Sequence, residues 1–248
     1  MFLTEGQTAK LDQVVKTKNA HLFDGVEMLT LSLVLGLLLL VAIPAQALWR
    51  TLGDRPKRAR IVRYRATIIE AVALMAFLAV VASIEGISAA DLGLDFPQTT
   101  GALVGLGIAV VLVGGMITAT FLAKPKQSGT DIVEAEELMP QTGQEAALFI
   151  LLAFVIGFAW EVLYRGFLLW WLTPLTGIVG AVLVAGVAYG LAHGWESHRS
   201  GIASIISALL FCTGYALTGS LWWLIIIHTA LPLVGMVAMR KAQTASSD

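Results

Sequence analysis

The chain has 248 residues, of which 57% are hydrophobic and only 13% are charged, and its formal net charge is -1. This composition excludes an ordinary soluble domain, and the nearly neutral balance argues against a nucleic-acid partner. We expect an all-α, polytopic membrane bundle of about seven transmembrane helices. The single cysteine, Cys212, lies in an apolar run, which excludes a disulfide framework and predicts a packing role.

Composition divides the chain into three segments. Residues 1–27 are polar and lack the pattern of a cleaved signal peptide, so we expect a surface segment ahead of the bundle. Residues 28–240 are predicted to form one transmembrane bundle, and residues 241–248 a short polar tail. Within the bundle, residues 146–240 carry the motifs described below.

Seven apolar runs follow one another, each about as long as a helix that crosses the hydrocarbon. Their approximate bounds are 28–48, 66–84, 103–122, 146–172, 178–193, 202–217 and 221–239. A turn at Pro174 and Gly177 separates the fourth run from the fifth. With the N-terminus outside and the C-terminus in the cytoplasm, the Lys and Arg of the inter-span loops fall inside, including the basic run 50–65. Such a chain suits a bacterial inner membrane.

The strongest signal within the apolar runs is the pair Glu161 and Arg165. Four residues apart on a helix, they share one face and can form an ion pair. A charge at membrane depth is costly unless it is paired or faces a wet cavity, and such charges often mark functional sites. The competing interpretation is a buried ion pair that only joins two helices.

Two histidines accompany this pair in the later runs. His193 ends the fifth run, and His228 lies in the middle of the seventh, where a buried imidazole needs a hydrogen-bond partner. Either histidine alone is compatible with a structural role as a polar link between helices. Tyr189 stands one helical turn before His193, which places its ring beside that histidine. Glutamate, arginine and two histidines in neighbouring runs together favour an intramembrane active site.

Three motifs carry these residues along the chain. They read Trp160-Glu-Val-Leu-Tyr-Arg165, Tyr189-Gly-Leu-Ala-His193 and His228-Thr-Ala-Leu-Pro232. Their order and spacing resemble the CPBP (Abi) family of intramembrane proteases, which includes the CAAX prenyl endopeptidases. The family pattern is Glu-Glu-x-x-x-Arg, then Phe-x-x-x-His, then His-x-x-x-Asn or Asp. The resemblance covers about residues 66–240.

The resemblance implies an endopeptidase in which glutamate and histidine activate a water that cleaves a membrane-associated peptide. In this chain, Glu161, His193 and His228 would then be catalytic, with Arg165 in support. We expect no cofactor, although one glutamate and two histidines would also suit zinc as ligands. The expected partners are the lipid bilayer and a membrane protein or peptide.

Two positions depart from the family pattern. Trp160 stands where the family has its first glutamate, and Pro232 stands where it has asparagine or aspartate. An indole cannot accept a proton, and a proline has no side-chain donor. Glu196 and His198, in the loop after His193, are either substitute catalytic groups or solvated loop residues.

These departures leave two functions open. The first is an intramembrane peptidase, with weakened activity if the missing groups are not replaced. The second is a catalytically inactive relative that serves as a binding, assembly or immunity factor for another membrane protein or complex. A small transporter or channel is disfavoured, because the sequence shows no inverted repeat with paired broken helices.

Overall fold

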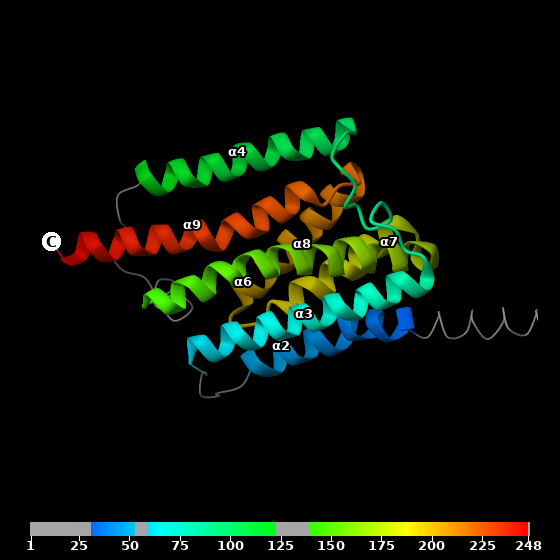
Figure 1. The fold of residues 1–248 in the computed structure, drawn as a ribbon, viewed down its shortest axis with the longest axis horizontal. Coiled ribbons are helices and arrows are strands. Elements are labelled where there is room, and N and C mark those ends of the chain that lie inside the picture. The colour runs from blue at the N-terminus through cyan, green and yellow to red at the C-terminus, as the bar shows by residue number, and fades with distance from the viewer. Residues whose placement is uncertain (1–30, 53–58, 123–138, 248) are drawn as a thin grey trace, which may run out of the picture.

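The computed structural model describes residues 31–52, 59–122 and 139–247, and within these ranges it contains no strand. In chain order (Figure 1), its elements are η1 (Leu38–Ala42), α2 (Ile43–Thr51), α3 (Arg60–Glu85), α4 (Thr100–Leu122), α6 (Gly143–Glu161), η2 (Val162–Leu168), α7 (Leu169–Ala192), α8 (His198–Thr218) and α9 (Trp222–Ser247). The prefix η marks a π-helix, whose turns are wider than those of an α-helix. The prediction of an all-α bundle is confirmed.

Six described helices are long and apolar enough to cross a membrane, so the chain is an integral membrane protein. They are Leu31–Thr51, Arg60–Glu85, Thr100–Leu122, Gly143–Ala192, His198–Thr218 and Trp222–Thr244. The predicted count of about seven is close to this number. The difference lies in the run Gly143–Ala192, which the sequence divides into a fourth and a fifth span.

That run has 50 residues, which is about 75 Å of straight helix and far more than a bilayer requires. It is bent at Gly177, whose φ of 69° and ψ of 167° lie outside the helical region. Glycine reaches this conformation at little cost because it has no Cβ. The bend falls at the predicted turn, so the run contains the two predicted spans joined without a loop.

Helix boundaries differ from the predicted ones mainly around the basic run 50–65. Helix α3 begins at Arg60, whereas the second span was predicted to begin near residue 66. Arg63 and Arg65 therefore lie on the helix and not in a loop, because long arginine side chains can reach headgroups while their backbone stays helical. Residues 53–58 of the run lie outside the described ranges.

The two ends of the chain were predicted to be polar segments outside the bundle. The N-terminal segment 1–27 lies outside the described residues. At the other end, α9 continues to Ser247, so the described part of the predicted tail 241–248 extends the last helix.

Loops that the seven-span topology places on one side of the membrane contact one another. At one end of the bundle, the Leu221 N–H donates to the Gly93 carbonyl at 2.9 Å. At the other end, the Trp195 N–H donates to Thr51 Oγ1 at 2.8 Å. These contacts fit alternating crossings. Which end faces the cytoplasm stays a prediction.

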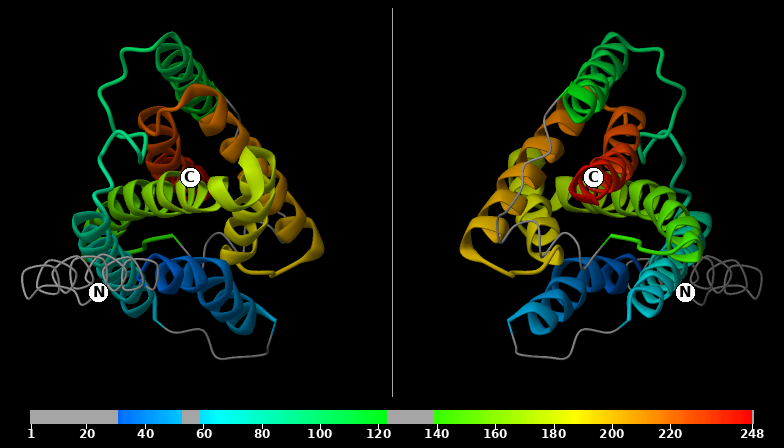
Figure 2. Two further views of the ribbon diagram at one scale, coloured as in Figure 1. Left: turned by 90° about the vertical axis from the view of Figure 1, so that its right-hand side faces the viewer. Right: turned by 90° about the vertical axis from the view of Figure 1, so that its left-hand side faces the viewer.

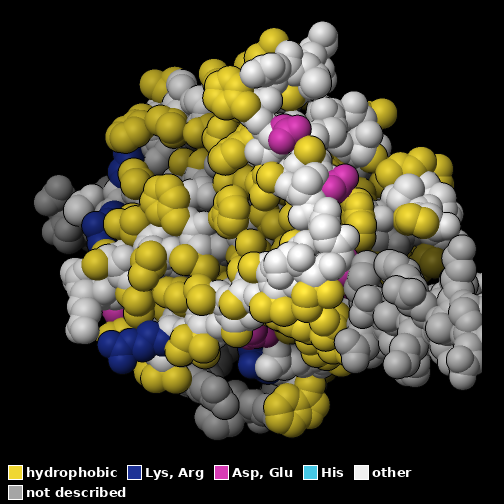
Figure 3. Space-filling view, turned by 45° about the vertical axis from the view of Figure 1, so that its right-hand side comes forward, with side chains coloured by type: hydrophobic (Ala, Val, Ile, Leu, Met, Phe, Trp, Pro, Cys, Tyr) yellow, Lys and Arg dark blue, Asp and Glu magenta, His cyan; other side chains and the backbone are white. Residues whose placement is uncertain are grey.

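Helix α4 stands at one edge of the bundle, where it packs on α8 and α9 (Figure 2). The core lies mainly around η1, α3, η2, α7 and the first half of α9, and α4 contributes to it chiefly through Ala109. Hydrophobic side chains cover much of the face shown in Figure 3, as expected of a protein whose solvent is lipid. Among the described residues, Glu161 and Arg165 are the charged side chains that are nevertheless buried, and they need an explanation.

Candidate active site

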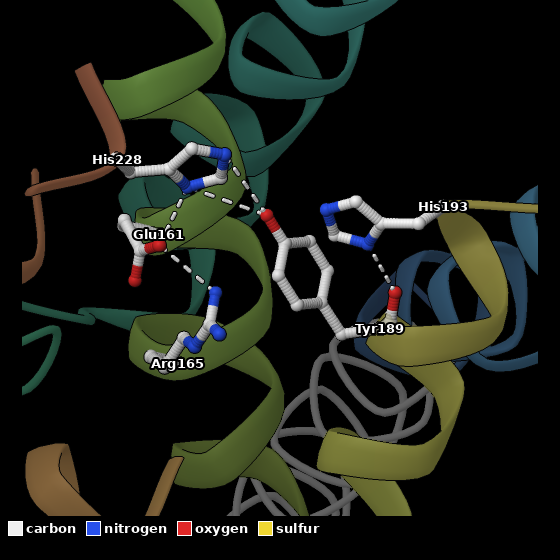
Figure 4. A network of polar contacts seen from close by, with 5 residues as sticks. All are labelled: Glu161, Arg165, Tyr189, His193 and His228. Carbon is white, nitrogen blue, oxygen red and sulfur yellow. Dashed lines mark hydrogen bonds and ion pairs between the residues drawn. The ribbon is translucent and has the colours of Figure 1, made fainter. Parts of the chain in front are cut away.

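Three segments bring the predicted polar residues together (Figure 4). Glu161 ends α6 and Arg165 lies in η2, while Tyr189 and His193 lie at the end of α7 and His228 lies on α9. Small residues allow the close approach of these helices. A Cβ on Gly157 of α6 would clash with Thr229, the neighbour of His228, so glycine is required for this packing.

Glu161 and Arg165 form the predicted ion pair, with Arg165 Nη1 2.9 Å from Glu161 Oε1. Their side chains are 1% and 0% exposed, so the pair is fully removed from solvent. Within the described residues, Glu161 Oε2 and Arg165 Nε and Nη2 have no hydrogen-bond partner. Buried polar groups are normally satisfied, so these atoms retain unused capacity to accept or donate a further hydrogen bond.

His228 on α9 contacts the same carboxylate, because its Nδ1 lies 2.7 Å from Glu161 Oε1. A carboxylate that is paired with arginine accepts hydrogen bonds, so Nδ1 carries the proton and donates a hydrogen bond to Glu161. The other ring nitrogen, Nε2, is then left with a lone pair. The carboxylate thus fixes both the tautomer and the orientation of His228.

His193 is fixed in the same way by its own helix. Its Nδ1 lies 2.9 Å from the carbonyl oxygen of Tyr189, which can only accept a hydrogen bond. Nδ1 is therefore the protonated nitrogen, and Nε2 is a free base in the neutral ring. Unlike Glu161 and Arg165, His193 is exposed, so the cluster runs from a buried ion pair to an accessible imidazole.

Tyr189 lies at the centre of the cluster. The Arg165 guanidinium stacks over its ring, 4.1 Å from the ring centroid, and the His193 ring meets it edge-on at 4.6 Å. Its hydroxyl lies 3.3 and 3.4 Å from the two ring nitrogens of His228. The sequence correctly predicts the ring beside His193, but the hydroxyl reaches His228 on a different helix. Tyr189 was therefore missing from the predicted site, although its spacing to His193 was a signal.

The residues that depart from the family pattern flank this cluster. Trp160 is half-buried, and its ring lies 6.0 Å from that of Tyr164. Pro232 lies one turn after His228, inside α9, which continues through it as a helix. Glu196 and His198 are exposed in and after the loop that follows His193, where the His198 ring contacts Trp195.

The three residues considered as zinc ligands are not gathered around one point. Glu161 and His228 bond to each other, and the Tyr189 side chain stands between His228 and His193 (Figure 4). Within the described ranges, no three His, Cys, Asp or Glu side chains are grouped as a metal ion would need. This arrangement does not fit a zinc site.

Comparison with known proteins gives a match to a family model over part of the chain. Residues 142–234 match a family model described as type II CAAX prenyl endopeptidase Rce1-like. No curated protein and no solved structure matches the chain. The matched segment contains all three motifs and every residue of the cluster, whereas the first three spans lie outside it. The resemblance predicted from the motifs is therefore confirmed over residues 142–234.

Proposed function

We propose that this protein is an intramembrane endopeptidase that hydrolyses a membrane-associated peptide. The observation that carries the proposal is the hydrogen bond between His228 Nδ1 and Glu161 Oε1, which joins a buried carboxylate to an imidazole in the matched segment. A histidine that a carboxylate orients in this way is prepared to accept a proton at Nε2.

The contacts suggest a division of roles that differs from the one the family resemblance implies. Glu161 Oε1 accepts from both Arg165 and His228, so we assign Glu161 to orienting the imidazole and stabilising its charge, and we assign removal of the proton to a histidine. The proton of the attacking water would pass to Nε2 of His228 or His193. The water oxygen would bond to the peptide carbonyl carbon, and the proton would then pass to the departing amide nitrogen.

The developing charge on the carbonyl oxygen needs a hydrogen-bond donor. Pro232 offers none, but the Tyr189 hydroxyl lies within hydrogen-bonding distance of His228. A peptide carbonyl that enters beside His228 could therefore accept from Tyr189. In this proposal, the accessible side of His193 is the route by which water reaches the site.

The proposed membrane setting follows from the charge pattern. The N-terminus would lie outside and the C-terminus in the cytoplasm, in a bacterial inner membrane. The contact between Thr51 and Trp195 supports one part of this arrangement, because it places the loop after His193 at the same end as the basic run 50–65.

A second candidate function is a non-catalytic binding or assembly factor for another membrane protein or complex. Trp160 and Pro232 favour it, because neither side chain supplies the group that the family pattern has at its position. The tight pairing of Glu161 with Arg165 also fits a structural bridge.

The two functions can be separated by cleavage in water labelled with oxygen-18. Membranes that contain the protein would be incubated in labelled water, and new peptide C-termini would be sought by mass spectrometry. Hydrolysis places one labelled oxygen in each new carboxylate. We expect labelled termini with the unaltered protein, and a fall of about a hundredfold or more with His193→Ala or His228→Ala.

His198→Ala is the matched control, because it removes an exposed imidazole outside the cluster. Labelled termini that persist in both His193→Ala and His228→Ala would contradict the proposed site. An absence of labelled termini, together with an intact membrane protein that copurifies in a fixed ratio, would favour the binding function.

A further inference from the structure

The first span, Leu31–Thr51, lies outside the matched segment but packs directly on the site-bearing helices. Its π-helical part, η1, contacts both η2 and α7, and α2 packs on α7. The approach is close, because a Cβ on Gly36 would lie only 2.6 Å from the ring of Trp171. Two hydrogen bonds then connect this span to the two sides of the site.

The first bond joins the span to the residue next to Arg165. The Tyr164 hydroxyl donates to the carbonyl oxygen of Leu39 at 2.9 Å, and both residues are 0% exposed. The Ile43 N–H, which would serve this carbonyl in an α-helix, bonds to Leu38 instead. In the π-helical register the donor would come from residue 44, which is a proline without an N–H.

The carbonyl of Leu39 therefore lacks a donor from its own helix, and the Tyr164 hydroxyl supplies one. A buried carbonyl without a donor is costly in a membrane, so this bond fixes η2 against the first span. Tyr164 immediately precedes Arg165, and its ring lies 4.6 Å from that of Tyr189. The position of the buried ion pair thus depends on a proline in a distant span.

The second bond joins the end of the same span to the loop after His193. The Thr51 hydroxyl is both an acceptor and a donor: Oγ1 accepts from the Trp195 N–H at 2.8 Å and donates to the Ala47 carbonyl at 3.0 Å. Gly194, with a φ of 87°, packs so closely on Thr51 that a Cβ would lie 2.6 Å from Thr51 Cγ2. The chain just after His193 is thereby held in a strained turn that only glycine adopts readily.

We propose that Tyr164 and Thr51 are positioning residues, through which the first span fixes the two sides of the candidate site relative to each other. The Leu39 carbonyl holds the side that carries Glu161 and Arg165, and Thr51 holds the side that carries His193. The two anchors are about 18 Å apart along the span, so one rigid helix sets both positions. The inference rests on the proposed function in one respect: that function gives Glu161, Arg165 and His193 their catalytic or supporting roles.

The test uses nitrogen-15 NMR of the whole protein in detergent micelles, with its four histidines labelled. The ring signals report which nitrogen of each histidine carries the proton. We expect Thr51→Val to lower the ratio of the Nδ1–H to the Nε2–H form of His193 by about fivefold to tenfold, because the hydrogen bond to the Tyr189 carbonyl is loosened. Thr51→Ser keeps the hydroxyl and should restore the ratio.

Tyr164→Phe should instead alter the signals of His228, which depend on Glu161, and leave those of His193 unchanged. Tyr215→Phe is the matched control, since it also removes one hydroxyl, beside Gly93 and away from the cluster. A purely structural role predicts lower thermal stability for Thr51→Val and Tyr164→Phe with unchanged histidine signals, and that result would overturn the proposal. The readout needs no substrate, so a failed cleavage assay would leave this test intact.

Discussion

The π-helix η2 and helix α4 are both apolar segments of the same bundle, but their surroundings are opposite. Every residue of η2, Val162–Leu168, is buried within the protein. In the 23 residues of α4, only Ala102, Gly105 and Ala109 are buried, and most large side chains face outward. Hydrophobicity therefore does not decide which residues enter the interior, because lipid is as apolar as the core.

Small residues and polar contacts instead decide which segments are buried in the interior. Near the site, Gly157 and Gly190 bring backbones together, and Glu161, which pairs with Arg165 on its own helical run, also bonds to His228 across helices. On α4, Gly107 and Gly114 face open space, where lipid provides the contact. This difference between the two regions leads to three predictions, whose expected effects on stability decrease from the first to the last.

The largest effect is expected for Glu161→Gln, which removes the negative charge from the buried pair. Arg165 would keep its charge without a counterion, and such a loss typically costs about 3–5 kcal/mol of unfolding free energy. Unfolding in mixed micelles with increasing sodium dodecyl sulfate measures this quantity. A loss below about 1 kcal/mol would show that the pair is not important for stability.

The double variant Glu161→Gln with Arg165→Met separates the lost charge from the lost packing. Removal of both charges leaves no unpaired ion, so the double variant should be more stable than Glu161→Gln alone. A double variant that is less stable by the full sum of the single losses would indicate that the two residues act independently.

Replacement of glycine by alanine should change the unfolding free energy in opposite directions in the two regions. In Gly190→Ala, the new Cβ would lie 2.5 Å from Ile205 Cα on α8, and such overpacking costs about 1–3 kcal/mol. In Gly114→Ala, the Cβ meets no protein atom, so the helix should gain about 0.5–1 kcal/mol from the lower entropy cost of alanine. Unfolding in mixed micelles measures both changes in free energy. Changes of the same sign in the two variants would contradict the proposed difference between the two regions.

The predictability of the two regions from the sequence also differs. The run that forms α4 could be identified by length and hydropathy alone, and its predicted bounds of 103–122 are close to Thr100–Leu122. The pairing of Glu161 with Arg165 follows equally from their spacing on a helix. These features are local, so a single segment contains the information that determines them.

The remaining features of the site depend on contacts between distant segments. Neither the hydroxyl of Tyr189 at His228 nor that of Tyr164 at Leu39 could be predicted, because the partners lie 39 and 125 residues apart. The π-helical register of η1, which leaves the Leu39 carbonyl without a donor from its helix, is likewise a result of packing. Pro44 was a signal, but the sequence does not show which side chain replaces the missing N–H.

The smallest effect concerns the few polar contacts that hold α4 to the bundle. Lys241 of α9 donates from Nζ to the carbonyl oxygens of Thr120 (3.0 Å) and Phe121 (2.7 Å), in the last turn of α4. A cation at a helix C-terminus satisfies free carbonyls and interacts favourably with the helix dipole, which together are worth about 0.5–1 kcal/mol. Lys241→Met should therefore lower the unfolding free energy by about this amount.

The effect should also be local, since α4 packs only on the edge of the bundle. Hydrogen exchange at the last turn of α4 should become faster in Lys241→Met, while exchange in η2 stays the same. Arg240→Met is the matched control, because it removes a neighbouring cation whose side chain is exposed. If both variants changed α4 equally, general charge attraction to the membrane surface would explain the result. A change in Lys241→Met alone would mean that α4 is held by a specific cap, in contrast to the close backbone packing that holds η2.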